Sequence, residues 1–307
     1  MIFFYGEGRL GNQVFQFQAL SSLCNRAAVS NRNLERVLAI GLEDLDSLFD
    51  LRERPVKVVT RSGLVKRIAK YFVIPLLLRP LAKWLRLIGY AYEPRTGQGP
   101  YRGLSGELMR KAGLFNRLTF VDGGYYQNPQ MSHAAFPIDT LSVKAHWVAA
   151  ARAYLQSSVP SECEAIAVHV RRGDYLQFAT YGVNNLALPQ DYYWRAIRDV
   201  QQQVPNAYFI FVTDDAEWVS TTFADLPNKR TVATSVAADF AVMTQCRGAI
   251  VSNSTFSLAA ALLIDSPTVV VGPKYWFGFR VGVWLPPKIE CKRAPMNYVP
   301  VTAEATT

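Results

Sequence analysis

Residues 165–175 read Ala-Ile-Ala-Val-His-Val-Arg-Arg-Gly-Asp-Tyr, an apolar run that ends in a charged cluster. The apolar part predicts a strand buried in a parallel sheet, and such sheets bind their ligands at the carboxyl ends of the strands. Arg171 and Arg172 lie at that end, where a guanidinium can bind a pyrophosphate through paired hydrogen bonds. Gly173 would let the backbone pass close to the ligand. The alternative is a solvated basic turn in which Asp174 pairs with an arginine.

The second half of the chain alternates strands and helices in the manner of a doubly wound sheet. The predicted strands are 165–170, 208–212, 249–251 and 268–271, and the predicted helices are 189–204, a stretch from 216, 237–246 and 256–264. Asp214 and Asp215 follow a strand, where a carboxylate could accept from guanine or simply cap the next helix. The run 252–257, Ser-Asn-Ser-Thr-Phe-Ser, opens a helix whose first N–H groups suit an anion, although N-capping alone also explains these residues.

The first half of the chain is less regular. A predicted strand at 2–5 leads through residues 8–13, Gly-Arg-Leu-Gly-Asn-Gln, into a helix at 12–28. This turn lacks both the dinucleotide Gly-x-Gly-x-x-Gly pattern and a Walker lysine, so its spacing alone is a weak phosphate-binding signal. Further short strands are predicted at 37–40, 56–60 and 118–121. A break in the pattern near 157–164 predicts two domains, 1–158 and 159–307.

Composition indicates a globular, cytoplasmic protein. Half of the 307 residues are apolar, which is enough for a buried core in each of two domains. The four cysteines form no close pair and no metal-ligand spacing, so we expect reduced thiols and no metal. The start of the chain has no signal-peptide pattern, and no apolar run is long enough to span a bilayer. The single Asp-x-Asp spacing, at 44–46, is expected in a surface turn.

The net charge of +9 is concentrated in one segment. Residues 52–92 hold ten Lys or Arg and a single acid, Glu53. Within 61–90, leucines, a tryptophan and basic residues recur at helical spacing, which suits a peripheral contact with the inner face of a membrane. The alternative is two helices that pack on the core, interrupted by Pro75 and Pro80. Nucleic-acid binding is disfavoured, because the charge lies in this Leu-rich segment without stacking aromatics on strands.

The motifs together resemble the α-1,2-fucosyltransferase family, glycosyltransferase family 11. The resemblance rests on segments in the family's order: 8–17 with Gly-Arg-Leu-Gly-Asn-Gln, 124–127 with Gly-Tyr-Tyr-Gln, His169–Tyr175, Asp191-Tyr192-Tyr193 and Ser252–Ser257. Two features depart from the family pattern. Arg9 stands where bacterial members usually have Gly, and Leu258-Ala259 replaces a pair of tryptophans. The departures leave the donor chemistry intact and bear on the acceptor.

The resemblance implies a GT-B-like α/β fold, with two Rossmann-like domains facing a central cleft. It also implies transfer of fucose from GDP-β-L-fucose, with inversion and without metal or cofactor, to the 2-hydroxyl of a galactose-terminated glycan. A lipid-linked glycan is one candidate acceptor. The implied donor residues are Gly11, Asn12, His169, Arg171, Arg172, Asp214, Asp215, Ser254, Thr255 and Phe256, and the implied acceptor residues are Arg9, Asn12, Gln13, Tyr126 and Gln127.

Inversion requires a base that takes the proton of the acceptor hydroxyl. Asp174 is the first candidate, because it lies beside the arginines, and an Arg-orienting role is its alternative. Glu7 is the second candidate. The competing functions are a GT-B transferase that uses another nucleotide sugar and a non-catalytic sugar- or nucleic-acid-binding protein.

Overall fold

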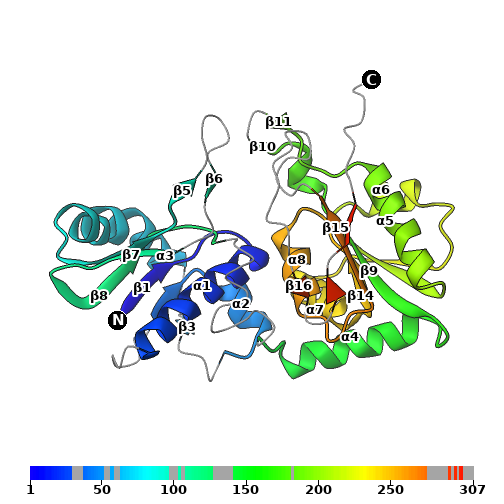
Figure 1. Ribbon diagram of the computed structural model, residues 1–307, viewed down its shortest axis with the longest axis horizontal. Helices are drawn as coiled ribbons and strands as arrows, with labels where there is room; N and C mark the ends of the chain where they lie inside the picture. The colour runs from blue at the N-terminus through cyan, green and yellow to red at the C-terminus, as the bar shows by residue number, and fades with distance from the viewer. Residues whose placement is uncertain are drawn as a thin grey trace. The chain divides into compact units, whose positions relative to one another are not determined.

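The structure is a computed structural model that describes residues 1–29, 37–51, 56–58, 63–96, 103–104, 108–126, 141–180, 183–274, 290–291, 294–295 and 297–299. The chain forms two compact units, which we call unit 1 (1–142) and unit 2 (143–307). Both are α/β, as predicted (Figure 1). The division falls before helix α4 (Ala145–Ser158), whereas the predicted boundary fell after it.

Helix α4 joins unit 2 because its apolar side packs there. Ala151 of α4 is buried against Ala241 of helix α7 (Val236–Gln245), and Trp147 packs on the same cluster. Arg152 Nε also donates to Gln245 Oε1 over 2.9 Å. The break in the sequence pattern near 157–164 is therefore the end of a helix inside unit 2.

Unit 2 is built on a sheet of six parallel strands. In spatial order they are β13 (Lys229–Val232), β12 (Ala207–Thr213), β9 (Glu164–Val170), β14 (Gly248–Ile250), β15 (Val269–Pro273) and β18 (Asn297–Val299). Numbered along the chain, this is the order 3-2-1-4-5-6 of dinucleotide-binding sheets. The order reverses between β9 and β14, and ligands of such sheets bind at that reversal. The outer strands β13 and β18 were not predicted, because neither has a sustained apolar run.

The predicted helices of unit 2 are present, with bounds that differ by one or two residues. They are α5 (Gln190–Gln203), α6 (Ala216–Thr222), α7 and α8 (Thr255–Leu262). Pro189 precedes the first turn of α5, which buries Tyr192, Tyr193 and Ile197 against the sheet. Helix α8 is buried along most of its length, which explains its small alanine-rich sequence.

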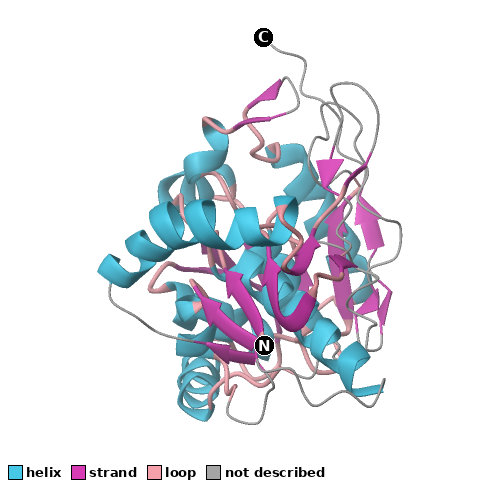
Figure 2. Ribbon diagram, turned by 90° about the vertical axis from the view of Figure 1, so that its left-hand side faces the viewer, coloured by secondary structure: helices cyan, strands magenta, loops and turns pink. Residues whose placement is uncertain are grey.

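Unit 1 also contains a six-stranded sheet, whose strands lie side by side in Figure 2. In spatial order they are β3 (Val56–Val58), β2 (Val37–Ile40), β1 (Ile2–Tyr5), β8 (Phe115–Val121), β4 (Ile88–Tyr92) and β7 (Met109–Lys111). All neighbours are parallel except β4 and β7. Helix α1 (Leu10–Val29) follows β1, and helix α2 (Glu43–Leu48) follows β2. The predicted surface turn at 44–46 is therefore wrong: these residues belong to α2, whose Leu45 and Leu48 are buried.

A helical segment at 63–84 differs from the prediction. It consists of α3 (Gly63–Ile68), η1 (Ala69–Leu78) and η2 (Pro80–Trp84), of which η1 and η2 are wide π-helical turns. Pro75 lies inside η1 and Pro80 begins η2, although proline has no N–H to donate and its ring ordinarily clashes with the carbonyl of the preceding turn. The i→i+5 bonds continue past them, from Arg79 N to Ile74 O and from Leu85 N to Pro80 O. Ile88, expected on the helix, begins β4 instead.

The remaining described elements are short. They are the strand pairs β5 (Arg95–Thr96) with β6 (Gly103–Leu104), β10 (Ala179–Thr180) with β11 (Val183–Asn184) and β16 (Glu290–Cys291) with β17 (Ala294–Pro295), and the turn η6 (Gly173–Leu176). Among the described residues, no helix combines the length and the apolar character needed to cross a membrane.

Candidate functional site

The loop after β9 carries Arg171 at the point where the unit 2 sheet reverses its order. Its guanidinium lies between two carboxylates: Nη2 is 2.6 Å from Asp174 Oδ1, and Nη1 is 2.7 Å from Asp214 Oδ2. The same guanidinium lies 5.5 Å from the centre of the Tyr175 ring. Asp174 therefore does pair with an arginine, as the alternative interpretation of this loop required.

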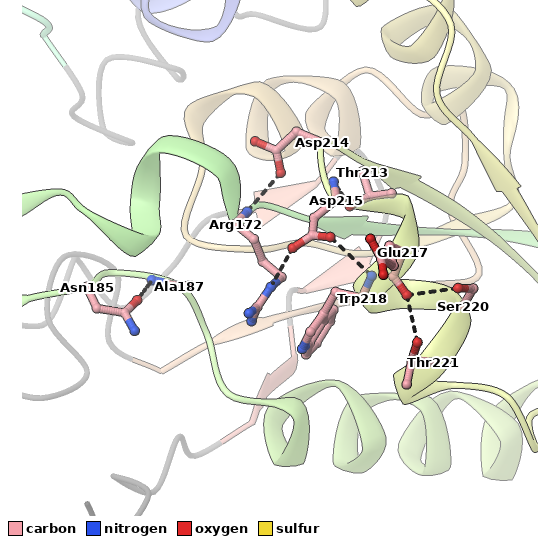
Figure 3. Close-up of polar contacts among 10 residues, drawn as sticks. All are labelled: Arg172, Asn185, Ala187, Thr213, Asp214, Asp215, Glu217, Trp218, Ser220 and Thr221. Carbon is pink, nitrogen blue, oxygen red and sulfur yellow. Dashed lines mark hydrogen bonds and ion pairs between the residues drawn. The ribbon is translucent and has the colours of Figure 1, made fainter.

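Arg172 is held differently. Its Nε is 3.1 Å from Asp215 Oδ2, and its guanidinium carbon lies 4.2 Å from the centre of the Trp218 ring, the geometry of a cation–π contact (Figure 3). Within the described part of the chain, neither Nη atom of Arg172 has a hydrogen-bond or ion-pair partner. The side chain is thus fixed at one end while its two outer nitrogens stay available for an anion.

The ends of β9 and β12 are joined by the two aspartates that follow β12. Asp214 Oδ1 accepts from the backbone N of Arg172 over 2.9 Å (Figure 3). Asp215 caps helix α6, because its Oδ1 accepts from Trp218 N over 3.1 Å. Both aspartates, predicted to contact guanine or to cap a helix, therefore hold the arginine loop, and Asp215 also caps.

Gly173 is required by the position of Asp214. A β-carbon at residue 173 would lie 2.7 Å from Asp214 Oδ2, closer than such contacts occur. Any larger residue would displace the carboxylate that pairs with Arg171. The glycine thus permits the close approach of the two strand ends, and not only an approach to a ligand.

His169 is buried at the end of β9, with 5% of its surface exposed. Its Nδ1 lies 2.8 Å from Ser252 Oγ, and its ring centre is 5.3 Å from that of Phe256. Burial, with a smaller contribution from the Arg171 charge, lowers the pKa of His169 to about 3. The imidazole is therefore neutral near pH 7 and can both donate and accept a hydrogen bond.

The start of α8 lies on the same sheet edge, because β14 and β9 are neighbours. Ser254 occupies the N-cap position, followed by Thr255 and Phe256 in the first turn. Tyr175 of the arginine loop donates its hydroxyl hydrogen to Asn253 O over 3.2 Å, which connects the loop to this helix start. The first N–H groups of any helix lack partners within the helix, so this end can add donors toward an anion.

The number of charged side chains in the site does not by itself favour the binding of an anion. Two arginines face three aspartates, whose side chains are 47% (Asp174), 27% (Asp214) and 28% (Asp215) exposed. An incoming phosphate must compete with them for the guanidinium groups. Asp174 is the most exposed of the three. Arg172 needs no displacement, because its outer nitrogens are available.

Unit 1 contains a polar pocket of about 560 Å³ at the carboxyl ends of β1 and β2. Its walls are formed by Tyr5, Gly6, Glu7, Gly8, Gln13, Gly41, Glu43, Asp44, Lys66, Lys70 and Tyr125. Two ion pairs line it: Glu7 with Lys70 at 3.0 Å, and Glu43 with Lys66 at 2.8 Å. The Glu7 hydrogen bond and charge raise the pKa of Lys70. The pocket thus offers carboxylates, ammonium groups and two tyrosines, which suits a ligand rich in hydroxyl groups.

The predicted residues of unit 1 take several positions. Arg9 is exposed, Asn12 is half-buried and Gly11 is buried at the start of α1. Gln13 is 4% exposed, and its amide donates to Gly8 O and Asp44 Oδ2 and accepts from Leu45 N, so it joins the turn to α2.

Two further predicted acceptor residues lie in the segment after β8. Tyr126 is completely buried, and its hydroxyl donates to Asp122 O over 2.7 Å, so its ring packs inside unit 1. Gln127 lies outside the described residues.

Sequence reasoning missed two partners in unit 2. Trp218 stands three residues after Asp215, the spacing at which the backbone N–H of a helix donates to an N-cap aspartate. Its contact with Arg172 could not be predicted, because the two residues come together only when β9 and β12 pair in the sheet. Ser252 was seen as part of a polar run, yet its contact with His169 joins two strands. Among the described residues, no group of three or more His, Cys, Asp or Glu is arranged to hold a metal ion.

Two Rossmann-like α/β units, one with an arginine loop at the reversal of its sheet, define the GT-B class of fold. The fold matches that of the α-1,6-fucosyltransferase NodZ, in crystals soaked with GDP-fucose and in crystals grown with GDP. The TM-score is 0.50 and the identity 15% in both cases, over 86–87% of this chain and 92–95% of NodZ. The chain belongs to glycosyl transferase family 11, whose family model matches residues 94–278.

Curated relatives match parts of the chain. O-antigen biosynthesis glycosyltransferase WbnK of Escherichia coli is 36% identical over 115 residues, which is 36% of this chain and 38% of WbnK. Galactoside 2-alpha-L-fucosyltransferase Sec1 of Mus musculus is 25% identical over 273 residues, which is 86% of this chain and 64% of Sec1. The matched stretches thus span less than two thirds of these relatives' own lengths.

Proposed function

We propose that the protein transfers L-fucose from GDP-β-L-fucose to the 2-hydroxyl of a galactose-type acceptor, with inversion at the sugar carbon and without a metal ion. Membership of glycosyl transferase family 11 and the likeness in sequence to Sec1, a galactoside 2-alpha-L-fucosyltransferase, support this choice. The observation that carries it is Arg172, clamped by Asp215 and Trp218 with both outer nitrogens available at the reversal of the sheet.

In this reaction the bond between the sugar carbon and the β-phosphate oxygen breaks, and its electron pair stays on GDP. Arg172 binds the pyrophosphate through its outer nitrogens, and Arg171 exchanges Asp174 for a phosphate oxygen. The first-turn N–H groups of α8, from Ser254 to Phe256, add neutral donors. A preorganised donor of this kind stabilises a transition state by about 2.7–4 kcal/mol.

Guanine binding is assigned to His169 and the adjoining strand ends. Nδ1 of the neutral imidazole is held by Ser252, and its other ring nitrogen, Nε2, can form a hydrogen bond with the edge of the guanine base. Asp214 already accepts from Arg172 N, and a guanine N–H would be a further donor to the same carboxylate. These contacts would distinguish guanine from uracil, because the two bases present different hydrogen-bond donors and acceptors to His169 and Asp214.

The acceptor hydroxyl must lose its proton as the new bond to the sugar carbon forms. We assign this to Asp174, because it lies beside Arg171 at the end of β9 and its carboxylate can accept a proton. Glu7, at the pocket of unit 1, is the alternative base. That pocket, with Asn12 and Arg9 at the start of the neighbouring helix, is assigned to the acceptor sugar.

No metal is proposed, because the arginines can supply the positive charge that a divalent ion supplies in other sugar transferases. The test is a transfer assay with GDP-fucose and a panel of galactose-terminated glycans, free and lipid-linked, followed by linkage analysis of the product. The expected product carries fucose in α-linkage at the galactose 2-hydroxyl. Greater thermal protection by UDP than by GDP, or a different linkage, would contradict the proposal.

A further inference from the structure

The segment 63–85 packs on unit 1 along only one side. Its buried residues, Ala69, Ile74, Leu78 and Ala82, recur every four or five positions, in step with the wide π-helical turns. Ile74, Leu78 and Ala82 pack with Ile88, Tyr90 and Phe120 of the sheet. The segment is thus anchored by this side, and its other side does not contribute to the core.

That other side is strongly apolar. The surface is formed by Leu64, Phe72, Leu76, Trp84, Leu85 and Leu114, each of which is more than 60% exposed. Leu114 comes from a distant part of the chain, but its backbone N donates to Arg86 O over 2.8 Å, which brings it to the end of the helical segment. Large apolar side chains gathered in this way mark an interaction surface, whereas single exposed ones do not. We call these six residues the outer surface.

The charges around the outer surface are positive. Three acids near the segment are each paired with one of its basic residues: Glu7 with Lys70, Glu43 with Lys66 and Asp122 with Arg79. The exposed Arg67, Lys83 and Arg86 have no ion-pair partner within the described ranges. The segment therefore combines exposed Leu, Phe and Trp side chains with cations that nothing described in the chain neutralises.

We propose that the outer surface docks on the headgroup region of an anionic lipid bilayer. Leucine, phenylalanine and tryptophan insert favourably at the boundary between headgroups and acyl chains, and lysine and arginine attract the surface charge of anionic lipids. A second copy of the chain is a poorer occupant, because a two-fold contact would bring identical basic residues together. The helix lies on the membrane and does not cross it. Such docking would bring the protein to an acceptor carried on a lipid.

The experiment measures co-sedimentation of the full chain with vesicles of phosphatidylcholine alone and of phosphatidylcholine mixed with phosphatidylglycerol. Wild type is expected to bind the anionic vesicles and to release as salt is raised. The variant Leu76→Gln/Trp84→Gln should bind at least about ten-fold more weakly, because it removes two inserted side chains. Arg67→Glu/Lys83→Glu should lose the preference for anionic vesicles.

Val236→Gln in unit 2 is the matched control, since Val236 is also an exposed apolar residue and lies on α7. It should bind as wild type does. All variants should keep the wild-type melting temperature and the transfer rate toward a soluble acceptor, so that loss of binding is not loss of folding. Vesicle binding is read without any enzymatic step, so it succeeds or fails independently of the proposed reaction.

Three results would overturn the proposal. The first is equal binding of wild type to neutral and anionic vesicles, or no binding to either. The second is wild-type binding by both double variants. The third is a dimeric wild type in light scattering that becomes monomeric in Leu76→Gln/Trp84→Gln, which would assign the outer surface to a second copy.

Discussion

Arg171 and Asp214 join two neighbouring strand ends of unit 2, with Nη1 of the arginine 2.7 Å from Oδ2 of the aspartate. The other oxygen of the same carboxylate accepts from the backbone N of Arg172 over 2.9 Å. One aspartate therefore sets both the side chain of one arginine and the backbone of the next. These contacts within the protein hold the loop, so a diphosphate would meet donors that are already positioned.

Arg172→Ala is expected to lower kcat/KM for GDP-fucose by ~10²–10³-fold, because it removes a preorganised charged donor worth about 2.7–4 kcal/mol. Arg171→Ala should cause a similar loss. Arg172→Lys should not restore activity. The planar guanidinium of arginine can bond Asp215 through Nε and still present two outer nitrogens to a phosphate, whereas lysine has a single nitrogen. Steady-state kinetics and GDP calorimetry measure these effects.

The matched control for the arginine variants is Arg195→Ala. Arg195 makes only a half-exposed pair with Asp191, at 2.7 Å on helix α5. It should keep wild-type turnover and melting temperature. Wild-type turnover by both Arg171→Ala and Arg172→Ala would refute the assignment of the donor site.

Asp174→Asn tests the proposed base. The amide keeps the shape of the side chain but cannot take a proton, so kcat should fall by ~10²–10⁴-fold while GDP binding stays within a few fold of wild type. If GDP binding falls in parallel with kcat, Asp174 orients Arg171 and is not the base. Glu7→Gln, assayed in the same way, tests the alternative.

His169 predicts a pH dependence of stability. The pKa of its imidazole is about 3 in the folded protein and ordinarily 6.5, so the unfolded chain takes up this proton first as the pH falls. The contribution of the neutral His169 to the free energy of unfolding is therefore fully present above about pH 6.5. As the pH falls from 6.5 to 3, the free energy of unfolding decreases by about 1.4 kcal/mol per pH unit. Urea unfolding at pH 7 and pH 5 measures it.

His169→Phe should be less sensitive to acid than wild type across this interval, because the group that titrates is absent. His146→Gln, a change at an exposed histidine, is the control and should follow wild type. An equal loss of unfolding free energy in wild type and His169→Phe between pH 7 and pH 5 would refute the prediction.

Gly173→Ala should displace Asp214, since the added carbon would lie 2.7 Å from Oδ2. We expect a destabilisation of about 1–3 kcal/mol and at least a ten-fold weaker binding of GDP, because both arginine contacts of Asp214 are disturbed. Gly63→Ala is the matched control: a β-carbon there meets no atom within 4 Å. Thermal melts with and without GDP separate the two effects. Unchanged GDP affinity in Gly173→Ala would show that the position of Asp214 does not matter.

Chelation tests the proposed independence from metal. Turnover with GDP-fucose should be unchanged after dialysis against EDTA and should not rise when Mg²⁺ or Mn²⁺ is added back, because the arginines supply the positive charge for the leaving group. A protein assayed in parallel and known to need Mn²⁺ verifies the chelation. Loss of turnover on dialysis with recovery on metal addition would overturn this part of the proposal.

Much of unit 2 could be predicted, because its signals are local. The strand that ends at Val170 and the helices that begin after Pro189 and Ser254 follow from apolar runs and from residues that favour helix starts. The charged residues at the strand ends were also visible. Strands β13 and β18 were missed, because short segments without apolar runs carry no periodic signal. The wide helical turns through Pro75 and Pro80 were missed because local rules treat proline as a helix breaker.

The sequence alone determined the α/β class and the position of the arginines at the end of a strand, because apolar periodicity and capping act between residues close in the chain. Only the tertiary structure decided which side chains pair in the site. Arg171 pairs with Asp174 and Asp214, and Arg172 pairs with Asp215 and lies over Trp218. These pairs depend on which strands become neighbours in the sheet, and strand order is set by the packing of the whole unit. The same reason explains Leu114 beside the end of the helical segment, 28 residues along the chain from its partner Arg86.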